Sequence, residues 1–341
     1  MRRRPVRAGG GAGGMAVVAV LALLVAVVAV LGMNTGYMKL SAPDVLRTLA
    51  GKGSPQQHLI LFDFRLPRIT VALLVGAGFA VSGCVLQSLA RNALAEPATL
   101  GITAGAGLAV ILFISYFPAV TAAPVYVLPA LALGGAAAAA ALIYLLAYRK
   151  GEGAAPTRLI LSGIALTAGI NAVQIVWALK LNPQNYAFVA TWIAGKIWGG
   201  GWPFVWALLP WAGVLLPLIF LKARVLNALN LGDAAASGIG VAVGRERLLL
   251  MGAAVALAGA CVAVSGGIGF VGLIAPHLAR RLVGPRHQIL LPASALTGSL
   301  LLLAADTIGR WIMQPAEIPA GVVVAVIGAP YFLYLLARAK A

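Results

Sequence analysis

Long apolar runs divide the chain, and they constrain its fold more than any other feature. Ten stretches have the composition of membrane spans, at 15–35, 67–89, 93–114, 124–147, 158–180, 202–221, 247–265, 268–283, 289–307 and 320–337. About 20 apolar residues in a helix cross the hydrocarbon core of a bilayer. Helices pair their own backbone groups, which lipid requires. The sequence therefore predicts an all-α polytopic membrane protein with about ten transmembrane helices.

The composition supports a membrane protein and argues against a nucleic-acid partner. Of the 341 residues, 62% are hydrophobic and only 10% are charged, whereas soluble domains carry about 25% charged residues. The net charge of +17 would suit nucleic-acid binding, but no basic stripe with interleaved aromatic residues is present. The charges lie in short loops instead, so we interpret them as topology signals.

The distribution of basic residues predicts the orientation. With the N-terminus inside, roughly two thirds of the 25 Lys and Arg residues fall in loops on the cytoplasmic side. Both termini are then cytoplasmic. The run from Met15 to Leu31 lacks a small-x-small cleavage site after it, so we expect a retained first span rather than a signal peptide. Residues 1–14 would form a basic tail, and 15–341 a single transmembrane domain.

Two arginines stand immediately before the second apolar run. Arg65 and Arg68 are three residues apart, which places them on one face of a predicted helix start. Pro67 lies between them and suits a first helical turn, where its missing N–H costs nothing. The pattern predicts two fixed positive charges at a membrane surface. A simpler interpretation is that they are interface anchors of the span.

Small residues interrupt the run that follows these arginines. Gly76, Gly78, Ser82 and Gly83 lie within it. Small residues let neighbouring transmembrane helices approach closely. We therefore expect this helix to be surrounded by other helices.

Three blocks of the chain resemble a known family. RLPRITVALLVGAGFAVSGCVLQSLARNALAEPATLGITAGAG at 65–107 resembles the second and third helices of FecCD-type permease subunits, which belong to ABC importers for iron–siderophore complexes, heme and cobalamin. The blocks GGIGFVGLIAPHLARRLVG at 266–284 and ADTIGRWIMQPAEIPAGVVVAVIGAPYFLYLL at 305–336 agree in the same order. The chain departs from the family pattern at Ala93 and Gly267, where proline is usual.

The resemblance implies a function and a set of partners. Two such permease subunits, identical or related, would enclose one pathway in the plasma membrane of a bacterium. Two ATP-binding subunits would attach on the cytoplasmic side, and a lobed substrate-binding protein would dock outside. The segment 185–211 looks like siderophore permeases. A ferric siderophore is therefore the expected substrate, with heme and then cobalamin as alternatives.

The resemblance also implies a docking site for the binding protein. In the family, an arginine at the position of Arg310 joins the pair at Arg65 and Arg68 at the outer mouth. Acidic residues on the two lobes of the binding protein would contact these three arginines. Opposite charges at such a face set register and association rate more than affinity.

The loop 222–246 is predicted to contact the ATP-binding subunit. It is too long and apolar for a plain connection, and too short and glycine-broken to span, so two short helices hinged at Gly232 and Gly238 fit it. Such a protrusion can dock in a cleft on a partner, and the resemblance implies that role. The alternative is an amphipathic loop on the membrane. The residues expected to couple are Leu231, Gly232, Asp233, Ala234, Ala235, Ser237 and Gly238.

Gate and hinge positions are carried over from the family or argued from the chain. Asn92 and Thr157 are the gate candidates, and the alternative for each is a helix cap. Gly266 and Gly267 form a turn and Pro276 interrupts the next span, so these three residues are hinge candidates. Residues 181–201 are expected to hold a short surface helix with aromatic residues at the interface.

Several functions are excluded by what the chain lacks. There is no Gly-x-x-x-x-Gly-Lys-Ser/Thr loop, so ATP hydrolysis must be supplied by a partner and the chain itself is not an enzyme. The spans carry no acidic residue near their middle, which disfavours a proton-driven carrier, the main rival. His277 has no companion ligand nearby, and Cys84 and Cys261 lie in apolar runs. We expect no metal site, no cofactor and no disulfide. A scaffolding role remains a third possibility.

Overall fold

The computed structural model describes residues 11–36, 38, 40–117, 126–149, 153–154, 156–197 and 201–338. Its helices and two short strands are α1 (Gly11–Asn34), α2 (Ala42–Leu49), α3 (Pro55–His58), the π-helix η1 (Leu59–Arg65), α4 (Leu66–Ala90), the 3₁₀-helix η2 (Pro97–Leu100), α5 (Ile102–Tyr116), α6 (Val127–Ala147), β1 (Tyr148–Arg149), β2 (Gly153–Ala154), α7 (Pro156–Ala178), α8 (Pro183–Ile193), α9 (Trp202–Leu221), α10 (Ala223–Asn230), α11 (Asp233–Gly238), α12 (Val243–Ser265), α13 (Val271–Val283), α14 (His287–Ile312) and α15 (Ala320–Arg338).

The predicted all-α membrane architecture is confirmed. Among the described residues, seven helical runs are long and apolar enough to cross a membrane. Two further predicted spans correspond to the shorter apolar helices α5 and α15. The tenth corresponds to α13, whose 13 residues extend only about 20 Å, short of the roughly 30 Å hydrocarbon core.

The predicted third span, 93–114, is wrong in its first part. Residues 91–101 form a turn followed by η2, and α5 begins only at Ile102. Asn92 starts this departure, because its side-chain oxygen accepts the N–H of Leu94 at 2.9 Å and so competes with helical pairing. Pro97 then lies in the first turn of η2.

The helix α4 is the centre of the bundle, as its small residues predict. It packs against α14, α12, α13 and α9. A Cβ added to Gly76 would clash with the backbone of Gly298 on α14, and one added to Gly83 would clash with Gly272 on α13. Because glycine has no side chain, these backbones come into direct contact.

The helix start predicted at Arg65 is wrong in one respect. The helical run begins ten residues earlier, at the capped N-terminus of α3, and continues through η1 into α4, so that Pro55–Ala90 forms one 36-residue run. Pro67 lies at the junction where the π-helix becomes an α-helix. A proline cannot supply the N–H that an upstream carbonyl needs, and a local change of helix type accommodates that loss.

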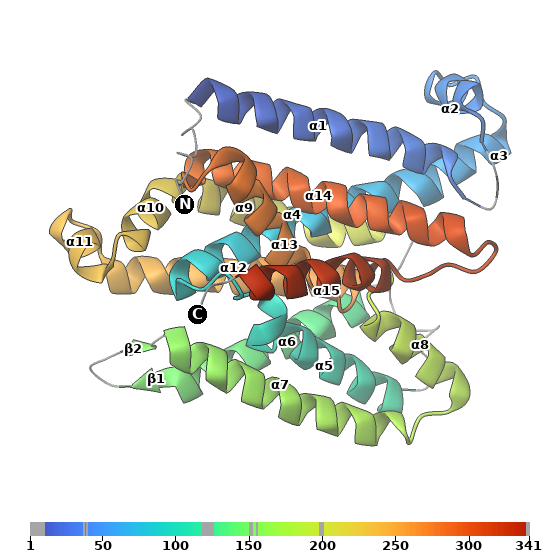
Figure 1. The fold of residues 1–341 in the computed structure, drawn as a ribbon. Coiled ribbons are helices and arrows are strands. Elements are labelled where there is room, and N and C mark those ends of the chain that lie inside the picture. Colours follow the sequence, from blue (N-terminus) through green and yellow to red (C-terminus); the bar gives the residue numbers. More distant parts are fainter. Residues whose placement is uncertain are drawn as a thin grey trace.

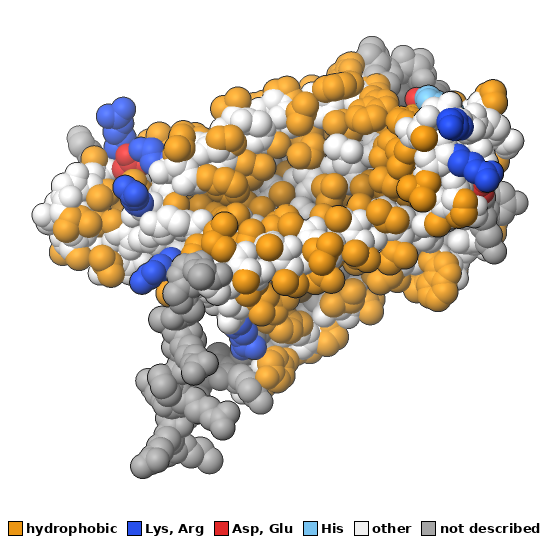
Figure 2. Space-filling model, turned by 90° about the horizontal axis from the view of Figure 1, so that it is seen from above, with side chains coloured by type: hydrophobic (Ala, Val, Ile, Leu, Met, Phe, Trp, Pro, Cys, Tyr) orange, Lys and Arg blue, Asp and Glu red, His pale blue; other side chains and the backbone are white. Residues whose placement is uncertain are grey.

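Charged side chains gather at the two ends of the molecule. Figure 2 shows Lys, Arg, Asp and Glu at both ends and an almost continuous apolar surface between them. One end carries α10, α11 and the strand pair, and the other carries α2 and α8 (Figure 1). The helix α1 begins, and α15 ends, toward the α10–α11 end. The side of the membrane on which that end lies stays a prediction.

Candidate functional site

The three arginines predicted to dock a partner come together at the α2–α8 end, but in an internal network. We call Arg65, Arg68, Asp306, Arg310 and Glu317 the arginine network. The Arg68 guanidinium donates to Oδ1 of Asp306 at 2.9 and 3.1 Å, and to the Glu317 carboxylate at 3.0 and 3.2 Å. This one side chain therefore joins α4 to α14 and to the segment that follows α14.

Asp306 is the buried centre of the network. Its side chain is 1% exposed, and its second oxygen accepts from Nε of Arg310 at 3.0 Å. Arg310 is one turn farther along α14 and is also buried, and its Nη1 donates to the carbonyl of Thr35 at 3.0 Å. One carboxylate thus serves two guanidinium groups, an arrangement in which each charge has a partner despite its burial.

Arg65 fixes the end of the first helix. It is 6% exposed, and its two terminal nitrogens donate to the carbonyls of Met33 and Met38. The last carbonyls of a helix have no partner within it and carry its negative dipole end, so a cation there is favourable. Their role in docking stays a prediction, and sequence reasoning gave these arginines no internal partners. The acidic residues at 306 and 317 were the signal that could have indicated them.

The predicted pair of short helices is present in 222–246. The helices α10 and α11 are joined at Gly232, whose φ is +112°, a conformation that favours glycine. The second bend is at Gly240 rather than Gly238, since Gly240 has a φ of +85°. Leu231 is 73% exposed and Ile239 66% exposed. The segment therefore presents apolar side chains outward from the end of the bundle.

Asp233 ties this protrusion to the bundle. Its carboxylate accepts from Arg91, at the end of α4, at 2.5 Å and from Arg247, on α12, at 2.8 Å. Partial burial opposes ionisation of Asp233, but the hydrogen bonds and charges of the two arginines outweigh it and lower its pKa. Within the predicted coupling set, Ala234, Ala235, Ser237 and Gly238 are exposed beside it.

A buried histidine that the sequence did not indicate connects α10 to the bundle. His287, the first residue of α14, is 0% exposed. One ring nitrogen lies 2.7 Å from the Ser88 hydroxyl on α4, and the other lies 2.8 Å from Oδ1 of Asn227 on α10. The Asn227 amide donates to Gln288 at 2.8 Å. This cluster is a second polar link between the protrusion and the bundle, here to α4 and α14.

The gate and hinge candidates lie in defined local structure. Asn92 lies in the turn after α4, one residue beyond the C-cap Arg91, and its side-chain oxygen accepts the N–H of Leu94. Thr157 lies in the first turn of α7, and its side chain is outside the described residues. Gly266 has a φ of +69°, and Gly267 donates its N–H to the Trp192 carbonyl at the end of α8. Pro276 is buried within α13.

Glu96 is a further residue that sequence reasoning missed. It lies in the turn between α4 and η2, and its carboxylate accepts the N–H of Phe270 at 3.1 Å. Phe270 precedes the first turn of α13 and has a φ of +66°. An acceptor oxygen at this position satisfies a donor at the start of α13. The turn that follows α4 is thereby attached to the hinge candidates.

The described residues hold no cluster of three or more His, Cys, Asp and Glu side chains that suits a metal ion. His277 stacks edge-on against Tyr331 rather than facing another ligand. Cys84 and Cys261 are free cysteines buried within the bundle.

The comparisons with known proteins agree with one another. The model of the FecCD transport family matches residues 22–338. The chain is 50% identical over 314 residues to the iron(3+)-hydroxamate import system permease protein FhuG of Bacillus subtilis, covering 91% of this chain and 93% of that protein. It is 46% identical over 306 residues to the Fe(3+)-citrate import system permease protein YfmE of the same organism, covering 90% of each. A solved structure described as an inward-facing conformation of a metal-chelate type ABC transporter matches 95% of this chain and 99% of its own, with a TM-score of 0.82 and 31% identity.

Proposed function

Because the chain belongs to the FecCD transport family, we propose that it carries ferric siderophore complexes across the membrane as the permease subunit of an ABC importer. It is a multi-pass protein of the bacterial inner membrane. The substrate assignment rests on the 50% identity to a hydroxamate permease over nine tenths of the chain. The second relative acts on iron citrate. An iron chelate is thus favoured over heme and cobalamin.

A permease of this kind implies ATP-binding subunits and a substrate-binding protein. We place the binding protein at the arginine network, with Arg65, Arg68 and Arg310 as the docking residues. Arg68 is the accessible member, since its side chain is 17% exposed and its partner Glu317 is 31% exposed. An acidic residue of the binding protein would approach Arg68 beside Glu317, while Arg65 and Arg310 hold the surrounding helices in place.

The ATP-binding subunits would receive the protrusion of 222–246, one subunit for each of two permease subunits. The exposed Leu231 and Ile239 supply apolar surface for a cleft. Closure of the ATP-binding subunits would push α10 and α11, and the His287 cluster would pass this movement to α4 and α14. Reorientation about Gly266, Gly267 and Pro276, with Asn92 and Thr157 at the inner gate, would complete alternating access.

Uptake of radioactive iron tests the substrate. Cells lacking this chain would receive the wild-type protein or the Arg68→Glu variant, and ferric hydroxamate, catecholate and citrate complexes and heme would be compared. Uptake of one iron chelate with wild type supports the substrate, and its loss with Arg68→Glu, when that variant is as abundant in the membrane as wild type, supports the docking face. Restored uptake of heme alone contradicts the siderophore assignment.

The same cells separate the importer from a proton-driven carrier. The importer requires an ATP-binding subunit, so a partner unable to hydrolyse ATP abolishes uptake. A carrier keeps transporting with that partner and stops when an uncoupler removes the proton gradient. If Arg68→Glu behaves like wild type and its uptake depends on ATP, the importer proposal holds and the assignment of Arg68 to docking is contradicted.

A further inference from the structure

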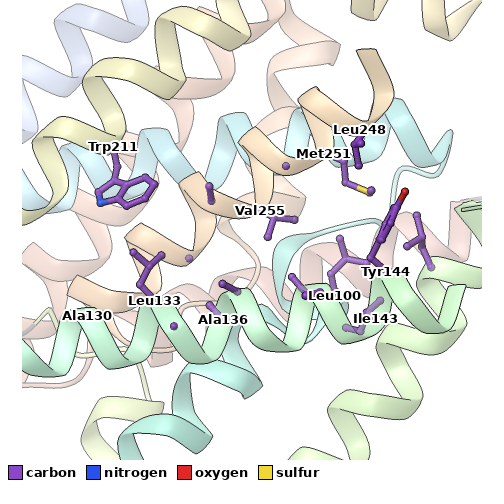
Figure 3. A pocket seen from close by; sticks show the side chains of 18 residues that line it. Leu100, Ala130, Leu133, Ala136, Ile143, Tyr144, Trp211, Leu248, Met251 and Val255 are labelled. Carbon is purple, nitrogen blue, oxygen red and sulfur yellow. The ribbon is translucent and has the colours of Figure 1, made fainter. Parts of the chain in front are cut away.

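A long apolar groove runs along one side of the bundle, away from the arginine network. Its walls are α6 and α12, with Trp211 of α9 at one end (Figure 3). Leu133 and Ala136 of α6 face the α12 stripe that contains Met251 and Val255. Its volume is about 650 Å³, within the range of about 300–1,000 Å³ typical of ligand sites.

The groove continues beyond this volume at both ends. A neighbouring hollow shares Ala130, Leu133 and Trp211 with it and extends to Val264 of α12. Another hollow shares Leu100, Leu159 and Met251 with it and ends at Arg247. From Val264 to Arg247 the helix rises about 26 Å. The residues that line these three hollows therefore extend along most of the thickness of a hydrocarbon core, which is about 30 Å.

The dimensions and lining of the groove limit what it can bind. The central volume of 650 Å³ lies along about 21 Å of α6, from Ala130 to Tyr144, so its mean cross-section is about 30 Å². The lining residues are apolar apart from the Tyr144 hydroxyl and the Trp211 indole N–H, and a cavity with so few polar partners holds little ordered water. An alkyl chain matches both the cross-section of the groove and its apolar lining.

The charge at one end identifies the headgroup. Arg245 lies one turn before the lining residue Leu248, on the same face of α12, and it is exposed. Arg149 is exposed just after the end of α6. Neither has a carboxylate partner among the described residues. Arg247 is partly neutralised by Asp233 and lines the small hollow next to the groove.

From these observations, we propose that the groove between α6 and α12 binds one acyl chain of an anionic phospholipid. The phosphate of this lipid lies between Arg149 and Arg245. The end with these arginines also carries α10 and α11 (Figure 1), so on the predicted topology the lipid belongs to the cytoplasmic leaflet. Anionic lipid is favoured there because each basic residue near the headgroup layer adds attraction. None of the residues that line the groove belongs to the arginine network.

Photo-crosslinking of lipids tests the proposal on the complete transporter. The complex would be reconstituted in vesicles of phosphatidylcholine containing a small fraction of phosphatidylglycerol with a diazirine on its acyl chain. We expect adducts concentrated on the groove-lining residues of α6 and α12. The same probe carried on phosphatidylcholine should give about tenfold fewer adducts at these positions.

Glycine substitutions provide matched variants. A Cβ added to Gly134 or Gly252, which line the groove, meets no atom within 4 Å, and the same holds for Gly213 on α9, which lies outside it. Gly134→Phe and Gly252→Phe should fill the groove and remove the adducts, whereas Gly213→Phe should leave them unchanged. Equal labelling in all three variants would overturn the groove as the site.

Two further outcomes decide the headgroup and the occupant. Arg149→Gln with Arg245→Gln should remove the preference for phosphatidylglycerol, whereas Arg224→Gln, an exposed arginine of α10, should keep it. Equal labelling by both lipids in the wild type would overturn the anionic headgroup. A Gly252→Cys variant that forms a disulfide between two permease copies would show that a second copy covers the groove, and the lipid proposal would fall.

Discussion

The two charged ends of this bundle are built in opposite ways. At the arginine network, the charges are mostly buried, all but Arg65 are paired with an opposite charge in the chain, and they join α1, α4 and α14. At the 222–246 segment, the apolar side chains point outward and the main ion pairs are half exposed. The first end holds helices in fixed positions, while the second offers a surface that is complete only with a partner.

The comparison indicates where mutation damages folding and where it damages coupling. Removing one charge from a buried network leaves another charge without compensation, which is costly. Removing an exposed pair costs little because water replaces it. The four changes below test this difference, beginning with the largest expected effect.

Asp306→Ala should be the most destructive change, because it leaves Arg68 and Arg310 without their shared carboxylate. Breaking a buried pair costs about 3–5 kcal/mol. We expect a large fall in the unfolding temperature of the purified subunit, or loss of the protein from the membrane. Asp63→Ala, at an exposed carboxylate of η1, is the control. Equal stability of the two variants would mean that the network does not fix the helices.

His287→Ala and Asn227→Ala should separate ATP hydrolysis from transport. Each leaves a buried polar partner unsatisfied, at a cost of about 1–3 kcal/mol. If the cluster transmits movement, both variants keep basal ATP hydrolysis and lose iron uptake, and the double variant is no worse than either alone. Asn230→Ala, at an exposed position of α10, should behave as wild type. Parallel loss of hydrolysis and uptake would point to misfolding instead.

Glu317→Gln should strengthen docking modestly. Glu317 is 31% exposed and occupies Arg68 from within the chain. Exposed pairs contribute roughly 0.2–1 kcal/mol, so releasing Arg68 should tighten the binding protein by up to about fivefold. Titration of the binding protein against the reconstituted transporter measures this. Glu317→Asp, which keeps the charge, serves as the control. Unchanged or weaker binding would show that Glu317 does not compete for Arg68.

The smallest effect is expected from protonation of Asp233 at low pH. Its pKa is lowered by Arg247 and Arg91 despite partial desolvation. Its contribution to stability is therefore present above its unfolded pKa, about 3.9, and is lost as the pH falls through the lower folded value. Asp233→Asn should reduce stability slightly at pH 7 and flatten the acid dependence below about pH 4. A pH profile identical to wild type would contradict this pairing.

Local pattern was sufficient for most elements of the fold. The apolar runs predicted the helices, because the length of an apolar segment is a local property of the chain. The glycines of α4 predicted its central position, because small residues let neighbouring helices approach closely. The break before α5 was not predicted, since the Asn92 turn and η2 interrupt an otherwise apolar segment. The long run from Pro55 was missed because a π-helix accommodates Pro67.

The sequence by itself determined the membrane class, the family and which arginines meet at one end. Apolar length and a motif are properties of the chain alone. Tertiary structure decided what those arginines do, because Asp306 is 238 residues from Arg68 along the chain. It likewise joined His287 to Ser88 and Asn227, and opened the groove between α6 and α12. Such contacts depend on how helices pack, and no local pattern encodes the partner of a buried polar group.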